Sequence, residues 1–205
     1  MRNAPASKLL LALAAMDLFA QAAGNVKIDS EQARVIVLTA QPHQKSALEN
    51  HSLNGVLIYL DGGEIIETSG GQARKLEVKA GEAKWSPGQQ PLTIECNSDH
   101  PIRIVEIELK NHPQKQPALS PIDPLKADPR HYSLVFENDQ VRVLRVRFGP
   151  HEEGVRHEHV LNHIVVYLND QARGKSGDVR LDEPMTHNEQ NPLDHSVERI
   201  AVDLK

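Results

Sequence analysis

The sequence predicts an all-β protein built from two tandem barrels of the jelly-roll type. A long internal repeat indicates two copies of one domain. Within each copy, short β-branched runs alternate with clusters of Gly, Pro, Asn and Asp, the pattern of strands joined by turns. After the N-terminal segment, no stretch has the apolar spacing of an amphipathic helix. Frequent short strands of this kind favour a sandwich or a barrel.

The N-terminus has the layout of an export signal. Arg2 and Lys8 precede the apolar run Leu9–Met16, and Ala20-Gln21-Ala22 supplies an A-x-A cleavage pattern. The run is too short to span a bilayer, and we expect no membrane span elsewhere. Asp17 is unusual in such a signal, so an ordinary N-terminal helix stays open as the alternative. We predict a signal peptide over residues 1–22, cleaved near Ala22, and a periplasmic or secreted mature protein.

The internal repeat organises the remaining chain. Gln32–Leu60 aligns without a gap with Gln140–Leu168, and ten of the 29 aligned positions are identical. The two copies also end alike, at Ile102–Lys110 and Val197–Lys205. A period of this length indicates duplicated domains rather than a solenoid. We predict barrels over residues 24–110 and 131–205.

The two copies differ in their middle segments. Residues 61–80 have the pattern of a strand–turn–strand hairpin, whereas the second copy has only the short segment 169–176 in that place. We therefore expect the second barrel to lack a hairpin and to be more open on one side. Five prolines in residues 111–130 predict a linker between the barrels that is neither a helix nor a central strand.

The composition excludes several functions. A net charge of −5, with no basic run and 3% aromatic residues, argues against a nucleic-acid surface. Cys96 is the single cysteine, so no intramolecular disulfide can form. It lies in the apolar run 92–96, which predicts a buried strand thiol.

A histidine cluster is the strongest functional signal. His157, His159 and His163 have the spacing His-x-His-x3-His, and His187 follows in a turn-rich segment. Alternation along a strand places residues i, i+2 and i+6 on one face. Imidazole is the commonest side-chain ligand of metals, so this face predicts a site for a metal ion.

These residues resemble the two motifs of the cupin superfamily. Both motifs lie in the second copy of the repeat. The residues that resemble the first motif are His157-x-His159-x3-His163, and those that resemble the second are Gly177-x6-Pro184-x2-His187-x3-Asn191. Two such units in one chain resemble a bicupin, and the likeness covers about residues 24–205. The resemblance implies two tandem cupin-type double-stranded β-helix barrels and a small-molecule ligand or substrate. It is also compatible with a homodimer, because cupins commonly dimerise through outer strands.

The resemblance implies one divalent transition metal, held by His157, His159, His163 and His187. His163 stands where the family usually has glutamate, so the ligand set would be neutral. Fe, Ni, Cu, Zn and Mn are the candidate ions. Alternatively, His163 donates a hydrogen bond in the pocket and leaves three ligands. Glu49, His51 and Gly55 occupy the matching places of the first barrel, which is therefore expected to be degenerate, kept for packing or for a metal-free pocket.

Three further residues are candidates for substrate binding. Tyr167 shares a strand face with His163, although Tyr59 recurs in the copy without the site and favours a structural role. Arg145 and Arg147 interrupt an apolar strand, and an inward arginine would bind a carboxylate through two hydrogen bonds. Outward exposure is the alternative for both.

Three functions are compatible with these features. The first is a metal-dependent oxidoreductase of dioxygenase type, or an isomerase. The second is a non-catalytic protein that binds a metal, a sugar or an organic acid. The third is a purely structural pair of barrels with vestigial histidines. A shared fold does not choose among them.

Overall fold

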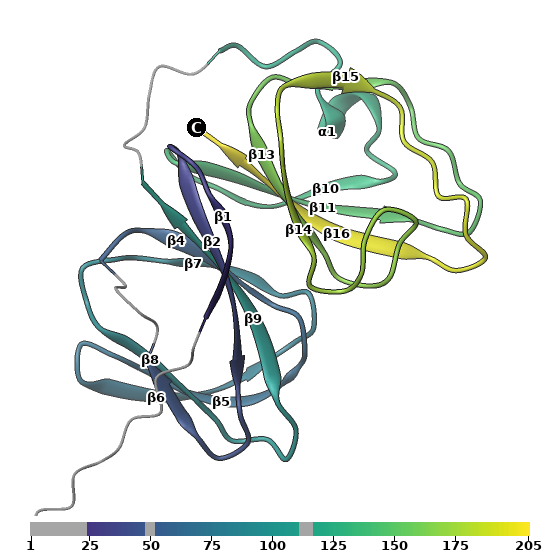
Figure 1. Cartoon of the computed structure of the whole chain (residues 1–205). Helices are drawn as coiled ribbons and strands as arrows, with labels where there is room; N and C mark the ends of the chain where they lie inside the picture. The colour runs from purple at the N-terminus through teal and green to yellow at the C-terminus, as the bar shows by residue number, and fades with distance from the viewer. Residues whose placement is uncertain (1–23, 48–51, 111–116) are drawn as a thin grey trace, which may run out of the picture.

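The computed structural model describes residues 24–47, 52–110 and 117–205, and it consists of two β-barrels that each pair a larger sheet with a smaller one (Figure 1). The strands within every sheet are antiparallel. The predicted all-β fold class is confirmed. Among the described residues, no helix is long and apolar enough to cross a membrane.

Within the described residues, the N-terminal barrel contains nine strands. They are β1 (Asn25–Asp29), β2 (Ala33–Ala40), β3 (Lys45–Ala47), β4 (Gly55–Tyr59), β5 (Gly63–Ser69), β6 (Gln72–Val78), β7 (Ala83–Ser86), β8 (Leu92–Cys96) and β9 (Ile102–Leu109). The larger sheet has the order β1-β2-β9-β4-β7 and the smaller sheet the order β3-β8-β5-β6.

The C-terminal barrel contains seven strands and one short helix. They are α1 (Pro124–Ala127), β10 (Tyr132–Glu137), β11 (Val141–Phe148), β12 (His157–His159), β13 (His163–Tyr167), β14 (Val179–Asp182), β15 (Met185–His187) and β16 (Val197–Leu204). The larger sheet has the order β10-β11-β16-β13-β14, and the smaller sheet consists of β12 and β15.

The larger sheets have the same topology, as the sequence repeat requires. β2 pairs with β9 as β11 pairs with β16. Gly55 lies opposite Glu108 in the first barrel, and His163 lies opposite Asp203 at the same place in the second. The copies therefore share their backbone frame and differ in the side chains placed on it.

The smaller sheets differ by one hairpin. β5 and β6 are joined at Gly70 and Gly71, whose φ angles of 56° and 77° lie in the left-handed region that glycine adopts at little cost. The C-terminal barrel has no counterpart to these strands between Tyr167 and Val179. The predicted loss of a hairpin from the second copy is confirmed, and one edge of β15 is left without a neighbouring strand.

A shared apolar core joins the two barrels. The outer faces of the two larger sheets contribute to one buried cluster, which includes Val56, Ile58 and Ile107 from the first barrel and Val143 and Ile200 from the second. Each of these side chains is fully buried. At about 25 cal/mol for each Å² of apolar surface removed from water, such a core strongly favours association. The barrels thus pack sheet against sheet.

The interior of the N-terminal barrel is filled separately. Its buried cluster includes Leu57, Tyr59, Ile94 and Cys96, all fully buried. Strand β8 shows why: its buried and partly exposed residues alternate, which is the period of a strand with one face in a core. The prediction of a buried strand thiol at Cys96 is confirmed.

The segment before β10 corrects one prediction. Residues 111–130 were expected to form a linker without a helix, but α1 lies within them, with Asp123 capping its N-terminus and Pro124 in its first turn. Ser120 and Asp128 are buried as well. The second half of the proline-rich segment is therefore part of the C-terminal barrel. Residues 111–116, the predicted signal peptide, and Glu49 and His51 lie outside the described residues.

Candidate metal centre

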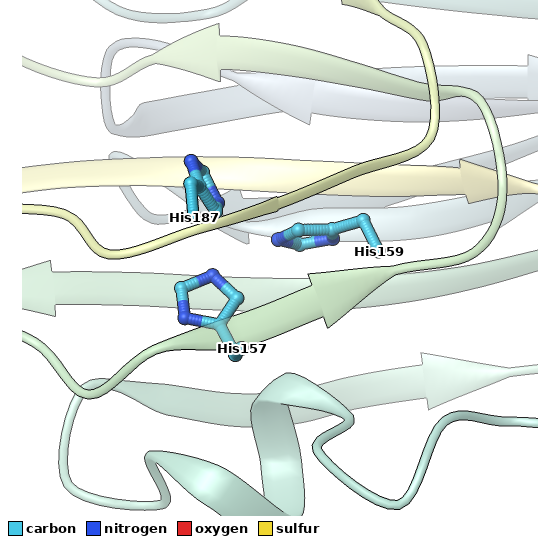
Figure 2. Close-up of side chains that lie close together, drawn as sticks. All are labelled: His157, His159 and His187. Atoms are coloured by element: carbon cyan, nitrogen blue, oxygen red, sulfur yellow. The ribbon is translucent and has the colours of Figure 1, made fainter.

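Three histidines converge inside the C-terminal barrel. In the β12–β15 ladder His157 lies opposite His187, and alternation places His159 on the same face as His157. Their ring centroids lie 4.5 Å apart for His157 and His187, 5.1 Å for His157 and His159, and 5.4 Å for His159 and His187. One nitrogen from each ring lies within 4.8 Å of the other two. Figure 2 shows the three rings grouped together.

The ring nitrogens are arranged as a metal requires. His157 Nδ1 donates to the Val155 carbonyl oxygen at 2.8 Å, which leaves its Nε2 unprotonated. His187 Nε2 is buried and has no hydrogen-bond partner among the described residues. A buried polar atom without a partner is costly, and a metal ion at the centre of the three rings would satisfy it. The residues present therefore fit a divalent transition metal.

His163 lies beside this group but outside it. Its ring stacks on His159 with centroids 4.4 Å apart and an angle of 18° between the planes. It belongs to a second group, with His159 and Asp203. Its Nε2 lies 3.7 Å from Asp182 Oδ2. The structure thus brings together three of the four predicted ligands, and the position of His163 favours its alternative role in the pocket.

Burial keeps these imidazoles neutral. Desolvation lowers the pKa of His157 and of His163, and lowers the pKa of His187 to about 4. The neighbouring histidines disfavour protonation further. Neutral imidazole is the form that binds metals, so the site is ready for an ion at neutral pH.

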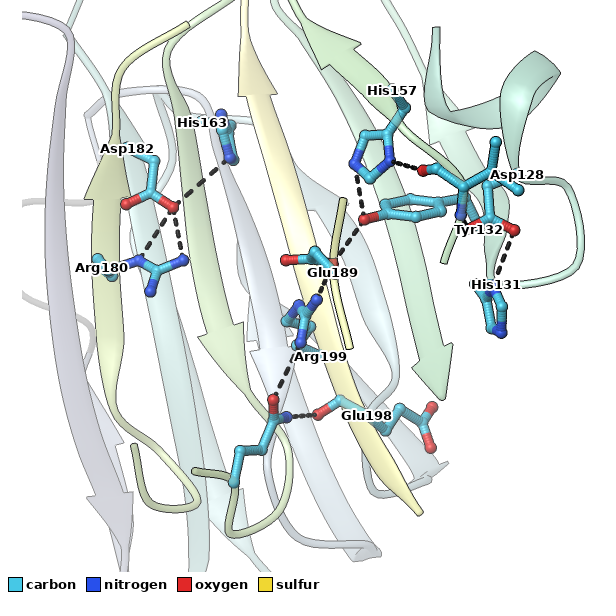
Figure 3. A network of polar contacts seen from close by, with 12 residues as sticks. Asp128, His131, Tyr132, His157, His163, Arg180, Asp182, Glu189, Glu198 and Arg199 are labelled. Carbon is cyan, nitrogen blue, oxygen red and sulfur yellow. Dashed lines mark hydrogen bonds and ion pairs between the residues drawn. The ribbon is translucent and has the colours of Figure 1, made fainter. Parts of the chain in front are cut away.

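A polar network adjoins the cluster (Figure 3). The Tyr132 hydroxyl donates to Glu189 Oε2 at 2.6 Å and lies 3.0 Å from His157 Nε2. Arg199 pairs with the same carboxylate. Burial acts to raise the pKa of Glu189, but Arg199 and the Tyr132 hydrogen bond outweigh it and bring the value to about 2. Burial and Glu189 raise the pKa of Tyr132. The pair is therefore a neutral phenol beside an ionised carboxylate.

A cavity of about 640 Å³ opens onto this network. Its walls come from β14, β15, β16 and the short segment that replaces the hairpin, and they include His187, Glu189, Arg199, Arg180 and Tyr167. The cavity lies along β15, on the edge that the missing hairpin leaves unpaired. The deletion therefore gives the histidine cluster access from outside.

The three predicted substrate-binding residues have different positions. Tyr167 lines the cavity, with the Arg180 guanidinium 5.9 Å from its ring centre. Arg145 and Arg147 instead pair with Glu198. Arg145 also donates to the Gly81 carbonyl of the other barrel. Neither arginine lines the cavity. Arg147 is 64% exposed, which agrees with the alternative of outward exposure, whereas Arg145 lies between the barrels and is 21% exposed.

Sequence reasoning missed several residues at the site. Glu189 lies two positions beyond His187, and Arg199 and Asp203 share a parity on the last strand, so alternation was a usable signal for all three. Tyr132 and Asp182 had no such signal, because strand pairing brings them to the cluster from distant parts of the chain.

The N-terminal barrel has apolar residues where the second has the site. Counting along the equivalent ladders of β8 and β15 places Leu92 where the second barrel has His187, and Ile94 where it has Glu189. Both are buried in the core. A separate cavity of about 520 Å³ lies against β5, β6 and β7, with Glu67, Lys84 and Trp85 in its wall. Within the described residues, groups able to hold a metal occur in the C-terminal barrel alone.

These features define a class: a double β-barrel protein with a histidine cluster beside a cavity in its second barrel. No family model and no curated protein matches the sequence, but solved structures share the fold. A cupin 2 conserved barrel domain protein from Leptotrichia buccalis is 8% identical with a TM-score of 0.55, over 91% of this chain and 90% of that one.

Two enzymes are among the similar structures. Oxalate decarboxylase of Bacillus subtilis, which has Mn(II) centers, is 11% identical with a TM-score of 0.62, over 86% of this chain and 70% of that one. A variant of salicylate 1,2-dioxygenase from Pseudoaminobacter salicylatoxidans, in complex with gentisate, is 10% identical with a TM-score of 0.56, over 85% and 69%. The chain thus has the cupin fold in two tandem copies, as the sequence motifs predicted.

The lowered histidine pKa values predict a pH-dependent stability of the metal-free protein. Unfolded imidazoles ionise near pH 6.5, so the buried neutral rings favour the folded state fully above that pH. The stability of the folded state that these rings supply declines as the pH falls from 6.5 towards about 4, where His187 itself becomes protonated. Urea midpoints between pH 7.5 and 4.5 measure this decline. His187→Asn should reduce it, whereas identical pH profiles for the two proteins would contradict the prediction.

Proposed function

We propose that the C-terminal barrel binds one divalent transition metal through His157, His159 and His187 and acts with it on a small organic anion. The convergence of three imidazoles carries the proposal; two of them are buried, and the third, the half-buried His187, has a buried Nε2 without a hydrogen-bond partner among the described residues. Three protein ligands are the number that catalytic sites use when a coordination position stays exchangeable. Imidazole donors suit Fe, Ni, Cu and Zn, and Mn is added from the Mn(II) centers of oxalate decarboxylase.

The proposed reaction class is supported by enzymes that share the fold and by the open cavity. Oxalate decarboxylase with its Mn(II) centers and salicylate 1,2-dioxygenase with gentisate share this fold. They support an oxidoreductase of dioxygenase type for this chain. When bound, the ion would supply Lewis acidity and an exchangeable position for a small molecule.

The charges around the site favour an anion. The histidine ligands are neutral, and each carboxylate near them is paired with an arginine. The pairs are Glu189–Arg199, Asp182–Arg180 and Asp203–Arg142. Because Arg142 also pairs with Asp123, these groups together carry one net negative charge. That charge offsets only half of a dipositive ion, so an anionic molecule in the cavity would still be attracted.

The remaining residues in and near the cavity would orient such a molecule. The side chain of Arg180 is 36% exposed at the cavity, and it uses Nε and Nη2 on Asp182, which leaves Nη1 for a ligand carboxylate. The Tyr132 hydroxyl lies beside the histidines and donates a hydrogen bond to Glu189, which Arg199 keeps ionised, so this pair would fix the position of polar groups next to the metal. The Tyr167 ring supplies an apolar wall.

A second candidate is a non-catalytic protein that binds a metal, a sugar or an organic acid. It is favoured by His163, which stacks on His159. If this imidazole joined the other three, four protein ligands would close the coordination sphere, as in structural sites. The metal would then have no exchangeable position.

Histidine substitutions test the ligand set. We expect one metal ion per chain, lost when His157, His159 or His187 is replaced by alanine because two imidazoles do not hold it. His163→Ala should retain the ion, and His43→Ala, which lies in a turn of the other barrel, should behave as wild type. Elemental analysis after reconstitution measures the content. Loss of the ion from His163→Ala would favour the closed four-histidine site, and two ions per chain would contradict the single-site proposal.

Carboxylic acids and their corresponding amides test whether the cavity prefers an anion. The metal-loaded protein should bind small carboxylic acids at least tenfold more tightly than the corresponding amides, and Arg180→Gln should remove most of this difference, about 1.4 kcal/mol or more. Arg147→Gln, whose side chain is on the outer face and 64% exposed, is the matched control. Calorimetry measures binding, and oxygen uptake over the same acids measures turnover. Equal affinity for acids and amides would refute the anion proposal, and binding without turnover would favour the second candidate.

We further propose that the protein works outside the cytoplasm as an exported bicupin. The support is the sequence of residues 1–22, with its charged start, apolar run and A-x-A pattern. The full-length chain expressed in a bacterial host should accumulate in the periplasm or the medium. Its intact mass should be that of a protein whose first residue lies near Ala23. An unprocessed cytoplasmic product would contradict this proposal.

A further inference from the structure

The last strand places a buried carboxylate directly behind one of the proposed ligands. Asp203 lies on β16 and is 1% exposed, and His159 is 4% exposed. Asp203 Oδ1 and His159 Nδ1 lie 3.9 Å apart. Neither atom has a hydrogen-bond partner among the described residues. A buried acceptor and a buried ring nitrogen that face each other are complementary if the nitrogen carries the proton.

Arg142 holds this carboxylate from the other side. Its Nε and Nη2 lie 2.8 Å and 2.7 Å from Asp203 Oδ2. Its Nη1 donates to Asp123 Oδ2 at 2.6 Å. All three side chains are at most 3% exposed. Because the guanidinium occupies Oδ2, Oδ1 is the oxygen left for His159.

Asp123 ties this network to the segment that enters the barrel. Its Oδ1 accepts from the Leu125 amide at 3.1 Å and caps α1. Next to it, the Ile122 carbonyl accepts from the Glu158 amide at 3.0 Å. Glu158 lies between His157 and His159, so the segment before the barrel is bonded to the strand that carries both histidines.

We propose that Asp203, held by Arg142 and Asp123, is a positioning residue that fixes the tautomer of His159. Its carboxylate accepts a hydrogen bond from the protonated Nδ1, so that Nε2 is the unprotonated nitrogen that faces the three-histidine centre. A carboxylate behind a ligating histidine orients the ring and increases its basicity. The proposal rests on the proposed metal site for its consequence, but the tautomer itself is a property of the metal-free protein.

A second cation at His159, His163 and Asp203 is the competing explanation for the partnerless atoms. Asp203 already bonds a guanidinium at Oδ2. A further positive ion on the same carboxylate would lie close to that charge and be repelled by it. The geometry therefore favours a hydrogen bond over a ligand bond at Asp203.

The N-terminal barrel supplies a matched control. Arg34 and Glu108 occupy the register positions of Arg142 and Asp203, and they form an ion pair at 3.5 Å. Leu92 replaces His187 in that barrel and leaves no three-histidine centre to orient. Glu108→Gln therefore neutralises an equivalent buried carboxylate away from the site.

The test is Asp203→Asn in the full chain. Arg142 should hold the amide oxygen, so that the amide NH₂ faces His159 Nδ1 and forces the proton onto Nε2. Nitrogen-15 spectra of the metal-free protein should show Nδ1 protonated in wild type and Nε2 protonated in Asp203→Asn. Co(II) titrations followed by visible absorption should show about 10- to 100-fold weaker binding. Asp203→Glu should restore most of it, and Glu108→Gln should match wild type in both measurements.

The outcomes are separable. An unchanged His159 tautomer in a folded Asp203→Asn protein would overturn the positioning role, whatever happens to Co(II). Loss of one of two Co(II) equivalents would also overturn it, by showing Asp203 to be a ligand of a second ion. If wild type binds no Co(II), the proposed metal function fails, and the tautomer comparison still decides the role of Asp203. Asp123→Asn, which leaves His159 and Asp203 intact, should weaken Co(II) binding less than Asp203→Asn does. An equal or larger loss would overturn the proposal that Asp203 acts directly on His159 and Asp123 only through Arg142.

Discussion

The back-to-back packing of the two larger sheets is the constraint on which the rest of the structure depends. Each barrel uses the outer face of its five-stranded sheet to build the shared core, in which Val56, Ile107, Val143 and Ile200 are fully buried. This burial holds both sheets in place without help from the barrel interiors. The two interiors were therefore free to differ, and they differ almost completely. A homodimer, predicted from the family, would need a surface other than these faces.

The interior of the N-terminal barrel is a packed apolar core, whereas many inward positions of the C-terminal barrel carry paired polar side chains instead of apolar ones. The apolar cluster inside the second barrel is confined to a few residues such as Leu144, Val146 and Phe148. The other inward positions carry histidines, carboxylates and arginines in ion pairs. Buried polar groups are tolerated when they are paired. In the described part of this barrel, the buried side-chain atoms without a hydrogen-bond partner are those of His159, His187 and Asp203 around the proposed metal and His131 Nε2, which lies 3.3 Å from the Glu152 carboxylate. Most of these atoms without hydrogen-bond partners therefore lie at the candidate site.

The missing hairpin links this interior to the outside. In the first barrel β5 pairs with β8 and covers the interior. In the second, the equivalent edge of β15 borders the cavity, and His187 and Glu189 line its wall. The absence of this hairpin from the second barrel therefore accounts for the access to His187. In the barrel that has the hairpin, Leu92 and Ile94 occupy the corresponding positions and are buried in its core.

The sequence by itself determined the two-barrel architecture, the lost hairpin and the strand face of His157 and His159, because repeats and period-two alternation are local properties that a linear pattern records. It also supplied His187 through a motif. Only the tertiary structure decided that His163 turns toward Asp182, that Arg145 and Arg147 lie outside the cavity, and that Tyr132, Arg142 and Asp203 surround the cluster. These relations depend on register between strands far apart in the chain, and a single sequence does not encode that register in any local pattern.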